Sequence, residues 1–104
     1  MTSVNHWFTL ITMIETIRHK GLAAYYRTEE PKGLPQKLVK RIGAILPALD
    51  VAQGPEDLIL PGLRLHPLKG DLRGYWSVSV SGNWRLIFRF KNKAVYDLDL
   101  VDYH

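Results

Sequence analysis

The hydrophobic period of the chain changes near Pro61, and this change limits the fold more than any other feature. Before Pro61 the apolar residues recur at helical spacing, whereas after it they alternate with polar residues as they do in strands. Helices in the first half and strands in the second favour an α+β fold, in which two N-terminal helices pack on one face of a small antiparallel β-sheet. The 104 residues suffice for one domain.

The first half of the chain predicts one short strand and two helices. Residues 13–17 form the expected strand, and residues 22–30 contain helix formers with apolar side chains at helical spacing. Residues 35–51 have the clearest helical pattern, with an apolar stripe on one face and basic residues on the other. Pro47 removes a backbone donor inside this helix, so a kink is expected there. One further helical turn is expected after Pro55.

The second half predicts short strands. Residues 76–80 and 84–90 read as a hairpin around "SGN", and residues 96–100 form the last strand after "KNK". An earlier strand alternates through residues 63–66 and ends at Pro67, which suits a sheet edge. One face of the sheet is then open, and basic side chains are expected on it or on the loop beside it: Arg64, His66, Lys69, Arg73, Arg85 and Arg89.

Composition narrows the function classes. The net charge of +4 favours an acidic partner such as nucleic acid or an acidic polypeptide. The sequence contains no cysteine, which excludes a disulfide scaffold, a thiolate metal site and a thiol nucleophile. No apolar stretch approaches the roughly 20 residues of a membrane span, and the start of the chain lacks the features of a signal peptide. A cytoplasmic protein without a membrane partner is expected.

Several motifs resemble those of one known family. The stretch from residue 60 to 90 contains "LHPLKG" and "GNWR", and the chain ends in "DYH". Together with "HKGL" at 19–22 and "PEDL" at 55–58, they resemble the HigB family of bacterial toxins within the RelE/ParE superfamily. The resemblance covers a single toxin domain at residues 13–104. Residues 1–12 are either an N-terminal extension or the product of a start codon assigned too far upstream.

The resemblance implies a function and a set of partners. HigB-like proteins are toxins of type II toxin–antitoxin systems and act as ribosome-dependent messenger RNA endonucleases, which enter the ribosomal A site and need neither metal nor cofactor. The expected partners are the ribosome and mRNA, a cognate HigA-like antitoxin of helix-turn-helix type, and operator DNA indirectly through the antitoxin complex. The RelE-like fold that the family implies agrees with the α+β fold read from the periodicity.

Cleavage of RNA without metal uses the ribose 2′-hydroxyl as nucleophile, so it needs a base, an acid and fixed positive charge. Histidine titrates near neutral pH, and either His66 or His104 can be the base with the other as the acid. Lys69 and Arg85 would hold the phosphate, and only arginine offers a bidentate fork. The resemblance matches the functional positions to residues of "HPLK", "GNWR" and "DYH": His66, Lys69, Arg85, Asp102, Tyr103 and His104.

The remaining positions have supporting roles. Tyr103 could stack on a base or donate to the phosphate, and Asp102 could orient a neighbouring cation. Residues expected to bind RNA without taking part in the chemistry are Arg64, Arg73 and Arg89. Regular alternation would turn Asp102 and His104 away from Tyr103, so the strand is expected either to end near residue 101 or to contain a bulge.

Other interpretations stay open. Arg85 and Arg89 could form ordinary cross-strand ion pairs with Asp97 and Asp99. A ParE-like toxin that binds DNA gyrase without cutting RNA would use the basic face as an interaction surface. An inactive protein that binds its antitoxin as a co-repressor is a third possibility. The nuclease is favoured because an inhibitor does not require two histidines and a phenol gathered with lysine and arginine.

Overall fold

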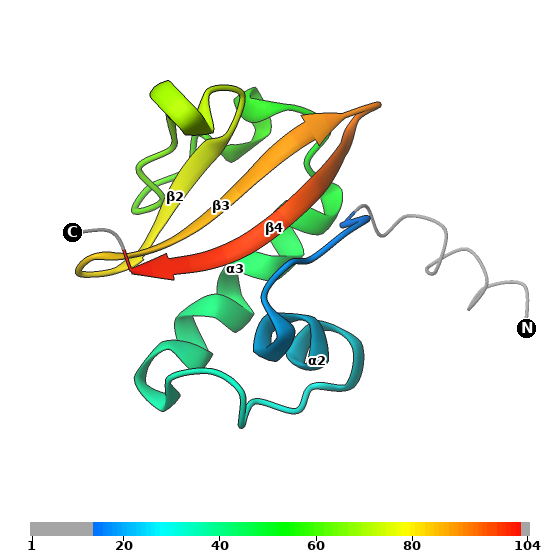
Figure 1. Cartoon of the computed structure of the whole chain (residues 1–104), viewed down its shortest axis with the longest axis vertical. Helices are drawn as coiled ribbons and strands as arrows, with labels where there is room; N and C mark the ends of the chain where they lie inside the picture. The colour runs from blue at the N-terminus through cyan, green and yellow to red at the C-terminus, as the bar shows by residue number, and fades with distance from the viewer. Residues whose placement is uncertain (1–13, 103–104) are drawn as a thin grey trace, which may run out of the picture.

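The computed structural model describes residues 14–102, and Figure 1 shows how their helices and strands are arranged. Four strands form one antiparallel sheet in the order β1-β2-β3-β4. Two α-helices precede the sheet, so the predicted α+β fold is confirmed. The elements are α2 (Lys20–Thr28), η1 (Gln36–Leu38), α3 (Val39–Val51), η2 (Pro55–Leu58), β1 (His66–Pro67), η3 (Gly70–Leu72), β2 (Trp76–Ser81), β3 (Trp84–Lys91) and β4 (Ala94–Asp102).

Local sequence explains where the helices begin and end. The side chain of His19 caps α2, because its Nδ1 accepts a hydrogen bond of 3.1 Å from the backbone amide of Leu22. The helix ends at Glu29, whose φ of 59° is left-handed. The second helix continues through Pro47 to Val51. The helical turn expected after Pro55 is present as η2.

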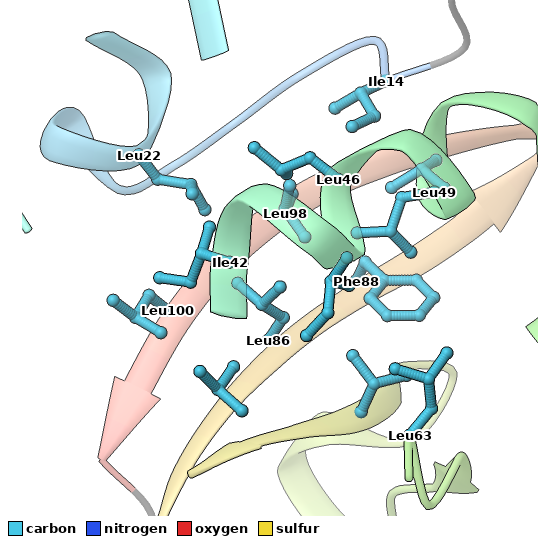
Figure 2. Packing of buried hydrophobic residues seen from close by; sticks show 14 of the residues in the cluster. Ile14, Leu22, Ile42, Leu46, Leu49, Leu63, Leu86, Phe88, Leu98 and Leu100 are labelled. Carbon is cyan, nitrogen blue, oxygen red and sulfur yellow. The ribbon is translucent and has the colours of Figure 1, made fainter. Parts of the chain in front are cut away.

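The core lies between the helices and one face of the sheet. Figure 2 shows Leu86, Phe88, Leu98 and Leu100 of the strands facing side chains of α3. Phe88 is completely buried. The α3 side chains that contribute are Ile42, Ile45, Leu46 and Leu49. The apolar stripe predicted for α3 is therefore its buried face, and Figure 1 looks onto the opposite face of the sheet.

The last strand contains a bulge that the alternation did not predict. Ile87 pairs with Asp99, whereas Arg89 pairs with Tyr96, so β4 has one residue more than β3 between these pairs. Asp97 takes up the extra length with a φ of 55°. Tyr96 therefore lies on the face of Arg89 and not on that of Leu98 and Leu100, because register partners share a face.

The segment before α2 covers the outer edge of β4. Ile14 and Ile17 form isolated parallel bridges with Val95 and Leu98, in place of the regular strand expected at residues 13–17. The amide of Arg18 donates to the carbonyl oxygen of Leu98 at 2.7 Å. These bonds leave less of the β4 edge free to pair with another chain.

The first strand is shorter than expected. It contains only His66 and Pro67, because the residues before it form a turn with positive φ at Gly62 (84°) and Arg64 (52°). Leu63 still accepts a backbone hydrogen bond of 2.7 Å from Ser79. The expected strand over residues 63–66 is therefore wrong for its first three residues. No helix within residues 14–102 is both long and apolar enough to cross a lipid bilayer.

Candidate active site

His66 and Lys69 lie together at the β1 edge of the sheet. Both side chains are exposed, and they line a shallow hollow of about 310 Å³ with Pro67 and Leu68. His66 pairs with Ser77 of β2, so it lies on the face of the sheet that α3 does not cover. Lys69 lies two residues after the strand and is the N-cap of η3, whose turn is closed by a hydrogen bond of 3.3 Å from the Leu72 amide to the Lys69 carbonyl. The two candidate groups are thus brought to one place.

Arg85 lies on the same face as His66. His66 pairs with Ser77, Ser77 pairs with Ile87, and Arg85 is two residues from Ile87 along β3. Two strand spacings and two residues separate the Cα atoms of His66 and Arg85 by roughly 12 Å. Arginine and histidine side chains are long enough to reach a common phosphate across this Cα–Cα distance. Arg85 is half-buried and has no ion-pair partner among residues 14–102, so its charge is available to an anion.

The centre of this face is less open than expected. Ile87 is 5% exposed and Ser77 is 1% exposed, although neither belongs to the main core beneath α3. The hydroxyl of Ser77 is buried and has no hydrogen-bond partner within the described part of the chain. Because Ser77 is the register partner of His66, this unpaired oxygen lies beside the backbone of the candidate site.

A polar network occupies the end of the same face that lies away from the β2–β3 turn. Arg89 binds Asp97 through Nε and Nη2, at 2.9 and 2.6 Å, and lies over the ring of Tyr75 at 5.7 Å. Arg18 donates to the Tyr75 hydroxyl at 3.3 Å, and this hydrogen bond is the main cause that raises the pKa of Arg18. Thr16 accepts from the Asp97 amide at 2.7 Å. The cross-strand pairing considered for Arg89 is therefore present with Asp97.

Tyr75 connects this network to the loop that holds Lys69. Its carbonyl accepts a hydrogen bond of 2.9 Å from Leu68, and its amide donates to Leu72 at 2.9 Å. The loop after His66 is thereby fixed at both sides of η3. Tyr75, Arg18 and Asp97 were not among the predicted site residues. The pattern around Tyr75 gave no signal, because its contacts depend on a bulge in β4 and on a bridge from the N-terminal segment.

The other predicted residues are more dispersed. Arg64 lies in the turn before β1 and lines a groove with Leu65 and Trp76, so its expected place on the open face is wrong. Arg73 is exposed immediately after η3, close in sequence to Lys69. Asp102 is the exposed last residue of β4 and pairs with Trp84, which puts it on the face opposite to that of Arg85.

The end of the chain carries two further candidates. Tyr103 and His104 lie outside the described residues. The strand runs through Asp102 and does not end at residue 101, and its bulge lies earlier, at Asp97. From Leu98 to Asp102 the strand is regular, and the end expected near residue 101 falls at the limit of the described residues.

Comparison with known families and proteins agrees with this fold. Residues 15–104 match the family model described as RelE-like toxin of type II toxin–antitoxin system HigB. The chain is 42% identical to Endoribonuclease HigB of Proteus vulgaris over 92 residues, which are 88% of this chain and all of that protein. It is 35% identical to Toxin HigB-1 of Vibrio cholerae serotype O1 over 75 residues, which are 70% of this chain and 79% of that protein.

Solved structures of more distant proteins have a similar fold. The YoeB dimer of Staphylococcus aureus matches with a TM-score of 0.56 at 22% identity, over 90% of this chain and 98% of that one. The YoeB/ParE toxin of Agrobacterium tumefaciens matches with a TM-score of 0.51 at 17% identity, over 88% of this chain and 98% of that one. At these identities the likeness concerns the fold alone.

Proposed function

The chain belongs to the RelE-like toxins of HigB type II toxin–antitoxin systems, and from this membership we propose that it is an endoribonuclease that cleaves mRNA on the ribosome and so stops translation. The relative from Proteus vulgaris, named as an endoribonuclease, is matched over its whole length. The observation that carries the proposal is the shared sheet face of His66 and Arg85, together with the hollow that His66 lines with Lys69.

The reaction is a transesterification, in which the phosphorus exchanges its bond to the 5′-oxygen for a bond to the ribose 2′-oxygen. A base takes the proton of the 2′-hydroxyl, that oxygen attacks the adjacent phosphorus, and the bond to the 5′-oxygen breaks as an acid protonates it. The products are a 2′,3′-cyclic phosphate and a 5′-hydroxyl. His66 and His104 are the two proton carriers, because imidazole exchanges protons near neutral pH.

The basic side chains stabilise the charge that builds on the phosphate oxygens. Arg85 supplies two parallel donors, and Lys69 supplies a mobile point charge from the edge of the hollow. Tyr103 supports binding of the nucleotide, whereas Asp102 lies on the face opposite to that of Arg85 and takes no part in this scheme. Arg73 adds positive charge next to the hollow, whereas Arg89 is already paired with Asp97 and contributes less free charge.

The partners follow from the family. As a toxin of a toxin–antitoxin system, the protein has an antitoxin. We propose that this is a HigA-like protein of helix-turn-helix type, that the pair contacts operator DNA through the antitoxin, and that the free toxin acts on ribosomes in the cytoplasm. The exposed basic groups around His66 and Arg85 give the site the sign of charge that RNA requires.

The test is cleavage of a defined mRNA on programmed ribosomes by the purified protein. We expect cutting in the A site, no cutting of the same mRNA free in solution, and a cyclic phosphate at the new 3′ end. A single 2′-deoxynucleotide 5′ to the cleaved bond removes the nucleophile and should abolish the reaction at that bond. Hydrolysis by an activated water would not be affected in this way.

Expression in cells and an assay of DNA gyrase distinguish the nuclease from the two alternatives. Growth arrest by the induced protein with intact cellular mRNA, together with inhibited supercoiling by DNA gyrase, would contradict the nuclease and support a ParE-like inhibitor. Absence of both growth arrest and cleavage would support a co-repressor. The substitution His104→Gln serves as the matched control, because it removes a proton carrier while keeping a polar side chain of similar size.

A further inference from the structure

A groove on the other side of β1 is separate from the RNA site. It has a volume of about 830 Å³ and is lined mainly by apolar side chains. Leu65 faces this groove while His66, the next residue, lines the hollow on the RNA side. The lining residues that matter here are Ile59, Leu60, Arg64, Leu65 and Trp76.

Two large apolar side chains of the groove are unusually exposed to solvent. Ile59 is 75% exposed and Leu60 is 47% exposed. They are two of the three large apolar side chains that are exposed within residues 14–102, and they are adjacent. Single exposed apolar residues are ordinary, but an apolar pair beside a groove is typical of a protein-binding surface.

The groove is held in shape before any partner binds. Arg41 of α3 donates to the carbonyl of Gly62 at 2.9 Å, and the amide of Leu63 donates to Leu60 at 3.2 Å. Leu63 is buried and bonded to Ser79 of β2. The turn is therefore fixed to α3 and to the sheet, so a partner would lose little free energy in ordering it.

Charge indicates the kind of partner. Arg64 is exposed at the groove and makes no ion pair with any residue from 14 to 102. The one carboxylate of the lining, Glu56, folds back over Gly54. The chain as a whole carries a net charge of +4. An apolar segment with a carboxylate placed opposite Arg64 would fit this surface.

We propose that this groove docks the cognate antitoxin, through an apolar segment whose carboxylate pairs with Arg64. Ile59 and Leu60 are the anchors, and Trp76 adds an aromatic side chain to the lining. The proposal rests on membership of a toxin–antitoxin family and not on RNA cleavage. Docking here leaves the face of His66 and Arg85 uncovered, since the groove and the hollow of His66 share no lining residue.

The test measures binding of the helix-turn-helix antitoxin encoded in the reading frame next to the toxin. Ile59→Glu places a carboxylate in an apolar contact and should raise the Kd by about 30-fold or more, the range of an interface hot spot. Arg64→Glu should raise the Kd by about 10-fold and make binding less sensitive to salt. Val51→Glu is the matched control, because Val51 is 63% exposed but does not line the groove; its Kd should stay within about threefold.

The outcomes separate docking from nuclease activity. Free Ile59→Glu toxin should unfold at the temperature of the parent and cleave mRNA at the same rate, and cells that produce it should stay arrested even when antitoxin is co-expressed. Equal Kd values for parent and Ile59→Glu would overturn the proposal. Equal weakening of antitoxin binding by Val51→Glu would also overturn it. So would a finding by sedimentation that Ile59→Glu changes only the self-association of the toxin. Failure of the parent to cut mRNA would instead contradict the proposed function and leave these binding results valid.

Discussion

Ser77 is the residue whose chemistry is least explained by folding alone. Its hydroxyl is buried, unpaired within residues 14–102 and adjacent to the backbone of His66. A buried hydroxyl without a partner costs about 1–3 kcal/mol. An apolar residue would suit such a position better, and a serine here is consistent with a hydroxyl that serves the site.

We predict that Ser77→Ala raises the free energy of unfolding by up to about 1 kcal/mol, because the substitution removes an unpaired polar atom and leaves most of the packing in place. Urea denaturation measures the change, and Ser79→Ala, two residues along the same strand face, is the control with little expected effect. A loss of more than about 1 kcal/mol in Ser77→Ala would mean that the hydroxyl has a stabilising partner in the folded protein.

At the scale of elements, the start of α2 packs directly on the connector before α3. A Cβ atom on Gly21 would lie 2.1 Å from the carbonyl oxygen of Gly33, so only glycine fits there. Gly43 inside α3 is different, because a Cβ there would meet the flexible end of Tyr25 at 2.7 Å. Gly21 therefore does not tolerate a Cβ atom, whereas Gly43 does, although both glycines lie in helices.

Gly21→Ala should destabilise the protein by more than about 2 kcal/mol, because backbone on both sides must move, despite the higher helix propensity of alanine. Gly43→Ala should be close to neutral, since the gain of up to about 1 kcal/mol in propensity offsets a small shift of Tyr25. The midpoints of urea unfolding compare the two. Equal stability of Gly21→Ala and the parent would contradict the close packing of these segments.

The type and order of the elements could be predicted from the sequence, but the details of two strands could not. Periodicity identified α3 and the β2–β3 hairpin because their apolar spacing is repeated several times. The bulge at Asp97 comes with hydrogen bonds to Arg89 on the neighbouring strand and to Thr16, which is 81 residues away in the sequence. The two-residue β1 depends on a turn with positive φ at Arg64, and an arginine in the sequence does not predict a positive φ.

At the scale of the whole molecule, two different surfaces lie close to the short strand β1: the hollow lined by His66 and the groove lined by Leu65. His66 and Arg85 lie on the face that we propose for RNA, and the groove lined by Leu65 is the surface that we propose for the antitoxin. The alternation around "HPLK" and "GNWR" predicted that His66 and Arg85 share one face of the sheet, and the strand register agrees with this. The groove was not predicted, because exposed Ile59 and Leu60 look like ordinary core residues until the fold is known.

The central claim is that Lys69 and Arg85 hold one phosphate, and a double-mutant cycle of single-turnover cleavage on programmed ribosomes tests it most directly. Lys69→Ala and Arg85→Ala should each slow cleavage by about 100-fold. The double substitution should slow cleavage by clearly less than the product of the two single effects, because groups that act on the same charge are not independent. Cleavage by either folded single variant within about threefold of the parent would contradict the account.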